Sequence, residues 1–545
     1  MTQKSSTLTE EFKVQLFLRN STGLVKEIGP FGSFLLPWLS IAGSGISVYA
    51  IQVIYYYPEG SVPLCMLILA IPCVLSLLTF ALMGIMTPRA AGAYVWTSRV
   101  LDPFVGWFGA GWLYWMCGFV TIGLIGYVFE SLIPVMFIII GQAVGIPGLV
   151  SFATAMESNV WMQGEVITAI ILICTVVNLV EVKYFMRVLM ALWAMNCVGL
   201  VVSMALFAVN NPTTIPAAWN NVWGAGSYQM IVNLATKYNL AGYVATTTGG
   251  FWSDTLSMCA FLFWALIGWE INSYVGGEVR NPRSSFLYFY TAGFIATAIW
   301  YVLVSFLAYN AYGGFILQYN YVYQLFQAGK LTATESAAVS PYMLLPSMPL
   351  FSASLAGPTA VRVLAAWWFW PLTGTVMGWL GCTRSMFGMA FDRMFPAVFG
   401  KVNERSHTPL IAILFTTIGG LIIALIDFSA YGYMVSASNS SFWFAFVYVI
   451  VAFTAIILPY KRPDMWEKGT RRRIFGIPDL TFIGALATMG MLWLLTLSTI
   501  GINLLAWNVS LVYMIIGILV FVYYAAKNER RGINISRIYG EIPPP

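Results

Sequence analysis

Residues 41–47 read IAGSGIS and lie within a longer apolar stretch, residues 31–54. A helix in lipid normally keeps all of its backbone hydrogen bonds, because the hydrocarbon offers no other partner. Gly43 and Gly45 lower the cost of leaving helical geometry, and the Ser44 hydroxyl can satisfy a freed backbone group. The stretch by itself favours two interpretations equally, a break in a membrane helix or a small-residue packing face between helices.

The composition of the chain is typical of a polytopic membrane protein. Of the 545 residues, 59% are hydrophobic and 9% are charged, whereas an average soluble domain has about 25% charged residues. A helix needs about 20 apolar residues to cross the hydrocarbon. We therefore predict an all-α protein with twelve transmembrane helices, near residues 31–55, 62–86, 104–129, 163–182, 186–209, 255–277, 286–312, 360–384, 409–428, 436–459, 480–503 and 507–526. The third span could also continue through Pro134 towards Ile140.

The basic residues gather in alternate connecting segments. If the N-terminus is cytoplasmic, all of the 27 Lys and Arg residues except Lys237, Lys330 and Arg362 fall in cytoplasmic segments. An excess of Lys and Arg in short loops marks the cytoplasmic side of a membrane. We therefore expect a multi-pass protein of the cell membrane with both termini in the cytoplasm. The basic run at 468–473 would also attract anionic lipid headgroups.

Few residues have the spacing of catalytic or metal-binding groups. The seven cysteines lie in apolar stretches without a CxxC pair, and the single histidine, His407, lies in a charged loop. These features argue against a metal or haem site and against an enzyme. We expect no cofactor beyond a coupling ion and no nucleic-acid partner. Two acidic residues near span ends, Glu130 and Glu181, are expected to reach water or to cap loops.

A second interruption lies in the sixth predicted span, where residues 261–285 read FLFWALIGWEINSYVGGEVRNPRSS. Gly268 and Glu270 fall near its centre, and an ionisable residue at membrane depth is a functional candidate by default. Interrupted helices at corresponding positions of two repeats are the best sequence indication of a transporter's central site. The first and sixth spans would then each begin a five-helix repeat, which favours the break at 41–47 over the packing face.

One amino acid would satisfy both broken helices. A half-helix that starts near Gly45 presents free N–H groups and a positive dipole end, which suit a carboxylate. Unwound carbonyls beside Gly268 would receive the ammonium group. The predicted substrate-binding residues are Gly43, Ser44, Gly45, Ile46, Trp264, Ala265, Ile267 and Gly268, with Glu270 as the coupling residue.

Five motifs resemble the permeases of the amino acid–polyamine–organocation (APC) superfamily. They are GSGI (43–46), PRAAGAYVW (88–96), WALIGWE (264–270), GEVRNPRSS (277–285) and RSMFGMAFDRMFPAVFGKVNERSHTPL (384–410). The resemblance implies a LeuT-like, five-plus-five inverted repeat with discontinuous helices 1 and 6, two extra C-terminal helices, and alternating access. The implied organisation is a cytoplasmic segment (1–28), the first repeat (29–209), an extracytoplasmic loop (210–254), the second repeat (255–460), a basic loop (461–479), helices 11–12 (480–527) and a cytoplasmic tail (528–545).

Within this superfamily the chain is similar to bacterial amino acid permeases and to the arginine/agmatine antiporters. The pattern W-x-x-I-G-x-E at 264–270 and LYW at 113–115 carry the similarity. It implies that Tyr114 lies near the pocket, that Trp264 covers the substrate and that Glu270 couples gating to protonation. Ile122 and Val376 depart from the antiporter pattern, so the pocket is expected to be more apolar.

The eighth span adds weaker candidates. Trp370 could gate the outer end of the span, although such tryptophans more often form an interfacial belt. Thr373 and Thr375 are possible sodium ligands, although threonines in membrane helices usually bond to their own backbone. The coupling ion, H+ or Na+, stays open at this point.

Charged residues at the inner end of the sixth span are candidates for an inside gate. Glu278, Arg280 and Arg283 could pair with Arg89 or Arg384, and Asp392 and Arg393 could join the same network.

The sequence as a whole predicts a secondary active transporter, or permease, that moves amino acids or related organic amines by alternating access. The alternatives are a permease-fold amino acid sensor without transport, and a transporter of polyamines or other organocations. A membrane enzyme acting on lipid-borne substrates would need a polar catalytic cluster, which the sequence does not offer. We expect a small-molecule substrate and contact with membrane lipids.

Overall fold

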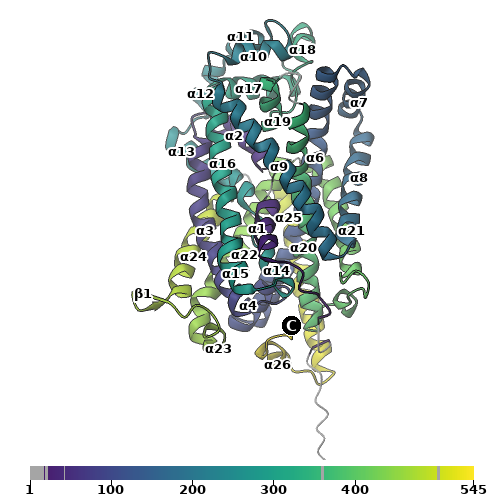
Figure 1. The fold of residues 1–545 in the computed structure, drawn as a ribbon, viewed down its shortest axis with the longest axis vertical. Coiled ribbons are helices and arrows are strands. Elements are labelled where there is room, and N and C mark those ends of the chain that lie inside the picture. Colours follow the sequence, from purple (N-terminus) through teal and green to yellow (C-terminus); the bar gives the residue numbers. More distant parts are fainter. Residues whose placement is uncertain are drawn as a thin grey trace, which may run out of the picture.

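The computed structural model describes residues 17–18, 22–41, 43, 45–356, 361–431, 433–499 and 504–544. The side chains of residues 143, 361–371, 430–438 and 506 lie outside this description. Most of the long helices run along the longest axis of the molecule, and short helices cover its two ends (Figure 1). We call the end that carries α10 and α11 the cap end, and the end that carries the C-terminus the tail end.

Nine helical spans in the described part of the chain are long and apolar enough to cross a membrane. The third predicted span extends well beyond residue 129, because its helix continues to Gln142 through Pro134. Broad apolar faces are typical of helices that contact lipid. The nine spans are α3 (Val62–Met86), Pro103–Gln142 with α5 (Pro103–Val105) and α6 (Tyr114–Val144), α8 (Val160–Leu179), α9 (Val182–Val209), Pro282–Tyr312 with α15 (Pro282–Ser284) and α16 (Thr291–Tyr312), α21 (Leu410–Ile426) extending to Ser429, α22 (Tyr433–Lys461), α24 (Asp479–Leu497) and α25 (Leu504–Glu529).

Of the other three predicted spans, the first and the sixth are interrupted, and the eighth is one continuous helix. The first consists of α1 (Pro30–Ser40) and the segment Gly45–Tyr56, which ends in α2 (Ala50–Tyr56) and is bent by 41° from α1. The sixth runs through α13 (Phe251–Leu262), a 3-10 turn to Leu266 and α14 (Ile271–Tyr274). The eighth is α20 (Val361–Phe391), a continuous helix of 31 residues.

Short helices form a cap over one end of the bundle. Residues 210–254, expected as an extracytoplasmic loop, and residues 313–356 contain helices that pack on one another (Figure 1). Trp219 is fully buried between the rings of Phe315 and Tyr319, which explains why these aromatic segments are ordered. The cap helices are α10 (Ile215–Trp223), α11 (Ser227–Lys237), α12 (Leu240–Thr247), α17 (Phe315–Gln327), α18 (Ala333–Val339) and α19 (Met348–Ala356), and α7 (Pro147–Ser158) stands beside them.

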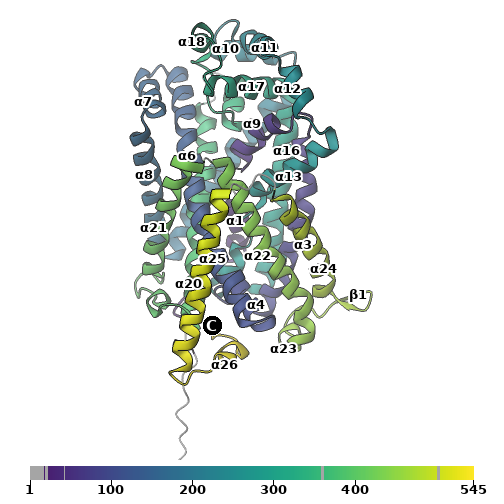
Figure 2. The ribbon, with the colours of Figure 1, turned by 180° about the vertical axis from the view of Figure 1, so that it is seen from behind.

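The tail end carries short elements and the end of the chain. A two-residue hairpin pairs β1 (Arg473–Ile474) with β2 (Ile477–Pro478) in antiparallel register, so that Arg473 lies opposite Pro478. Seen from behind, α25 runs along the outside of the bundle and leads to α26 (Ile535–Gly540) beneath it (Figure 2). The remaining tail-end helices are α4 (Gly92–Val100) and α23 (Pro463–Trp466).

Candidate functional site

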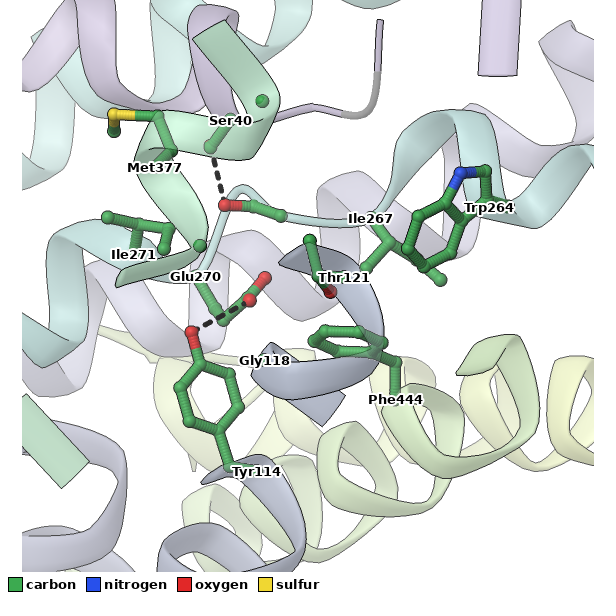
Figure 3. A pocket seen from close by; sticks show the side chains of 13 residues that line it. Ser40, Tyr114, Gly118, Thr121, Trp264, Ile267, Glu270, Ile271, Met377 and Phe444 are labelled. Carbon is green, nitrogen blue, oxygen red and sulfur yellow. Dashed lines mark hydrogen bonds between the residues drawn. The ribbon is translucent and has the colours of Figure 1, made fainter. Parts of the chain in front are cut away.

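The two interrupted spans meet near the middle of the bundle. The sixth span leaves helical geometry at Ile267, whose ψ is 152°, and at Gly268, whose φ is +114°. The Ser40 hydroxyl at the end of α1 donates a hydrogen bond of 2.6 Å to the Gly268 carbonyl (Figure 3). The end of one broken helix therefore satisfies a backbone group that the other break exposes.

Two glycines allow the broken helices to approach this closely. A Cβ atom on Gly268 would lie 2.4 Å from the Ser40 carbonyl oxygen, and one on Gly45 would lie 2.4 Å from the Ala265 Cα. Both distances are shorter than any normal contact, and the positive φ of Gly268 also disfavours a larger residue. The crossing of the first and sixth spans thus depends on glycine at both positions.

The Glu270 carboxylate lies directly after the break and is 1% exposed. The Tyr114 hydroxyl donates to one oxygen over 3.1 Å, and the Tyr448 hydroxyl donates to the other. The Tyr114 ring stacks on Tyr274 with 3.7 Å between ring centroids. Neutral hydroxyls hold the carboxylate without cancelling its charge, so its protonation state can respond to a ligand or to solvent.

A small cavity of about 20 Å³ lies between these residues. A cavity needs about 10–15 Å³ to hold one water molecule, so the site is contracted here and an amino acid would require its walls to move apart. Side chains from α6, α20 and α22 complete the walls around the break in the sixth span (Figure 3). The lining residues are Ser40, Tyr114, Gly118, Thr121, Trp264, Ile267, Gly268, Glu270, Ile271, Gly374, Met377, Gly378 and Phe444.

Five of the residues expected from the sequence line this cavity: Tyr114, Trp264, Ile267, Gly268 and Glu270. The other expected residues lie near it or beyond the described part. Ala265 packs against Gly45 and does not line the cavity. Gly45 and Ile46 are buried at the start of the second half-helix. The Gly43 backbone nitrogen lies near the cavity wall, because it would be 4.0 Å from a Cβ atom added to the lining residue Gly374. Thr373 and Thr375 are buried on either side of Gly374. Ser44 and the side chain of Trp370 lie outside the described residues.

A sequence profile of the amino acid permeases matches residues 33–531. The chain belongs to the amino acid permease family. It is 24% identical to the serine/threonine exchanger SteT of Bacillus subtilis (strain 168), over 93% of this chain and 98% of that protein. It is 25% identical to the probable polyamine transporter At1g31830 of Arabidopsis thaliana, over 85% of this chain and 76% of that protein. It is 24% identical to the polyamine transporter PUT1 of Oryza sativa subsp. japonica, over 70% of this chain and 58% of that protein.

Two aromatic residues of this permease's site were not predicted from the sequence. Tyr448 shares Glu270 with Tyr114, and Phe444 lies one helical turn before Tyr448 on α22. The spacing of four residues places both rings on one helix face, and that was the signal available in the sequence. The four-residue spacing does not show which of the other helices this face contacts.

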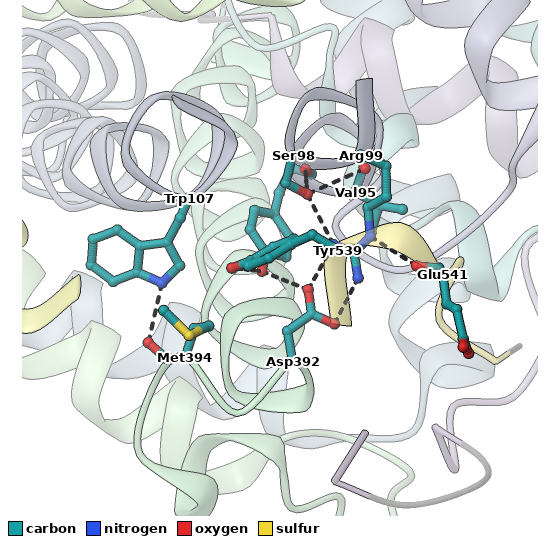
Figure 4. Close-up of polar contacts among 9 residues, drawn as sticks. Val95, Ser98, Arg99, Trp107, Asp392, Met394, Tyr539 and Glu541 are labelled. Carbon is teal, nitrogen blue, oxygen red and sulfur yellow. Dashed lines mark hydrogen bonds and ion pairs between the residues drawn. The ribbon is translucent and has the colours of Figure 1, made fainter. Parts of the chain in front are cut away.

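Two buried ion pairs lie at the tail end of the permease. Arg384 donates to both oxygens of Glu278, over 2.8 and 2.9 Å, and both side chains are almost fully buried. Arg384 was one of the two partners expected for Glu278. Arg99 binds both oxygens of Asp392 in the same way, over 2.7 and 2.8 Å (Figure 4). The first pair joins the turn after α14 to α20, and the second joins α4 to Asp392, directly after the end of α20.

The other charged residues expected in this gate have different partners. Arg280 donates to the Lys26 carbonyl, and Arg89 donates to the carbonyl of Pro543 near the C-terminus. Arg393 donates to the Phe17 carbonyl and does not share Asp392. Sequence reasoning did not connect Arg99 with Asp392, because 293 residues separate them.

The C-terminal segment packs against the second ion pair. The Tyr539 hydroxyl lies 3.1 Å from that of Tyr94, which donates to Asp392 over 2.6 Å (Figure 4). Arg99 also donates to the Glu541 carbonyl over 3.2 Å and lies over the Tyr539 ring. Residues 539 and 541 therefore belong to the same polar network as the Arg99–Asp392 pair.

Proposed function

We propose that this permease is a secondary active transporter that moves amino acids or related organic amines across the cell membrane by alternating access. The observation that carries the proposal is the meeting of two broken helices at a cavity that contains a buried carboxylate, Glu270. Broken helices at a central site are the usual construction of transporters, because unwound backbone can bind a ligand there. The contracted cavity lies between the cap and the tail-end ion pairs, which supports a site that opens to one side at a time.

The topology that we propose is twelve spans in a five-plus-five inverted repeat followed by two further helices. The nine spans in the described part of the chain, together with the first, sixth and eighth predicted spans, support this number. Basic residues such as Arg89, Arg280 and Arg393 contact segments at the tail end. The positive-inside rule then makes the tail end cytoplasmic and the cap end external.

In the proposed substrate complex the two helix breaks bind the two charged ends of an amino acid. Amides of residues 44–46 would bind the carboxylate, since a helix start presents free N–H groups. Carbonyls of Trp264–Ile267 would bind the ammonium group. Glu270 would couple transport to a proton, and sodium at Thr373 and Thr375 is the alternative.

A polyamine or another organocation is the second candidate substrate. The cavity combines an acidic side chain with the rings of Tyr114, Trp264 and Phe444, and aromatic faces attract organic cations. Two of the relatives, named as a probable polyamine transporter and a polyamine transporter, support the same class. A permease-fold sensor would bind the same ligands without moving them.

Transport by purified protein in sealed vesicles tests the proposal. A thermal-shift screen of amino acids and polyamines selects the ligand first, because a ligand at about 100 times its Kd stabilises the protein by about 2.7 kcal/mol. Vesicles preloaded with that ligand should then accumulate the labelled form, and a surface control variant, Glu181→Gln, should behave as the parent. Stabilisation without accumulation would identify a sensor and refute transport.

A further inference from the structure

A second, larger cavity lies at the cap end of the bundle. Its volume is about 660 Å³, and its walls come from α6, α7, α8, α17, Phe428 and residues 340–345. Two of the described lining residues are acidic, Glu130 and Glu157, and none of the described lining residues is Lys, Arg or His. The acidic side chains of this cap cavity therefore have no basic counterpart among its described lining residues.

Glu130 is the residue that makes this cavity unusual. Its side chain is 3% exposed, so the expectation that it reaches water or caps a loop is wrong. Within the described part of the chain its carboxylate has one hydrogen bond, a long one of 3.4 Å from the neighbouring Ser131 hydroxyl, and no ion pair. A buried carboxylate without a cationic partner costs free energy. It is an acidic group that lines the cavity, and no cationic side chain among the described residues forms an ion pair with it.

The other walls suit an organic cation. Rings of Tyr127, Tyr323, Phe326 and Phe428 line the cavity, and the first and last of these meet edge to face with centroids 5.5 Å apart. Aromatic faces attract ammonium groups, most strongly where water is excluded. Glu157, which is exposed, adds a second negative charge at the cavity. An aliphatic chain with ammonium groups matches both the rings and the carboxylates.

The cap cavity and the central cavity are both lined by α6. Thr121 lines the central cavity and Tyr127 lines the cap cavity, and both lie on the same continuous helix, α6. Six residues of helix span about 9 Å at 1.5 Å per residue. A cation in the cap cavity would therefore lie within about two helical turns of the central cavity.

We propose that the cap cavity is a second binding site, selective for aliphatic amines, with Glu130 as the buried partner of an ammonium group. This site extends the proposed function to the cap end, but it does not depend on which ligand the central site carries. A zwitterionic amino acid would bind poorly there, because its carboxylate would face Glu130 with no basic residue among the described lining residues to receive it.

Equilibrium binding of 1,4-diaminobutane to the full-length purified protein tests the proposal. A hydrogen bond to a charged group contributes about 1.5–3 kcal/mol, so Glu130→Gln should raise the Kd at this site about 10- to 100-fold. Glu181→Gln removes a carboxylate that is 43% exposed and should leave the Kd unchanged. If the central site also binds the diamine, the parent shows two sites and Glu130→Gln loses one of them. A Glu130→Gln isotherm equal to that of the parent would overturn the proposal, as would a parent that does not bind.

Cysteine protection gives a second readout that does not require Glu130 to be changed. Thr154 lines the cavity, is exposed, and its hydroxyl bonds to the Val150 carbonyl of its own helix, so Thr154→Cys should fold normally. The diamine should slow its reaction with a water-soluble thiol reagent, and the parent protein gives the background rate. A labelling rate that is independent of the diamine would overturn the site even if transport is intact. Conversely, protection without vesicle accumulation would refute the proposed transport and leave this site standing.

Discussion

Replacing Gly268 by alanine tests the crossing of the two broken helices. The new Cβ would lie 2.4 Å from the Ser40 carbonyl oxygen, about 1 Å closer than an ordinary contact, and the residue would keep a φ of +114°. Overpacking costs about 1–3 kcal/mol, and a side chain in this backbone region costs about 1–3 kcal/mol more. We therefore expect Gly268→Ala to lower the free energy of unfolding by about 2–6 kcal/mol.

Three further variants separate the contributions. Gly45→Ala meets the Ala265 Cα at the same 2.4 Å but without a positive φ, so it should cost only the overpacking part, about 1–3 kcal/mol. Ser40→Ala removes the hydrogen bond to the Gly268 carbonyl and should cost about 1 kcal/mol. Gly164→Ala is the control, because its Cβ would meet no atom within 4 Å in the helix α8.

The assay is unfolding of the purified protein in mixed micelles, followed by tryptophan fluorescence. Since alanine is the better helix former, Gly164→Ala should be neutral or up to about 1 kcal/mol more stable. The order of destabilisation should be Gly268→Ala, then Gly45→Ala, then Ser40→Ala. A Gly268→Ala protein as stable as Gly45→Ala would show that the positive φ carries no strain, and wild-type stability of both would refute the close crossing.

Three other predictions follow from the charged groups. Glu270→Gln should bind substrate but lose the pH dependence of uptake in vesicles, and an unchanged pH profile would remove this residue from coupling. Glu278→Gln removes one partner of the buried Glu278–Arg384 pair and should lower the free energy of unfolding by about 3–5 kcal/mol. Glu278→Gln combined with Arg384→Met should recover much of this loss, which a double-mutant cycle would measure. Hydrogen bonds from the Lys237 ammonium and from Tyr238 lower the pKa of Glu335 to about 2. Because this folded-state pKa lies below the unfolded value, the stability that the contact of Glu335 with Lys237 and Tyr238 gives the cap should be fully present above about pH 4.5 and be lost as the pH falls towards 2. Proteolysis of the cap at graded pH would detect this loss.

Local features of the sequence were sufficient for much of the fold. Runs of apolar residues predicted where helices cross the bundle, because length and hydropathy are properties of one segment. The breaks at Gly43–Gly45 and at Gly268 were visible for the same reason, since glycine inside an apolar helix weakens it wherever the helix packs. Glu270 was recognisable because a lone carboxylate inside an apolar span stands out without any knowledge of its partners.

Contacts between segments that are distant in the chain could not be predicted from the sequence. Tyr114 and Tyr448 reach Glu270 from 156 residues before it and 178 residues after it. Glu130 was expected near the end of a span, but α6 continues beyond it and the side chain is buried by the packing of other segments. Helical periodicity shows which residues share a face, but it does not show which other face they meet. Partners, burial and cavities arise when the helices pack, and so only the tertiary structure decided them.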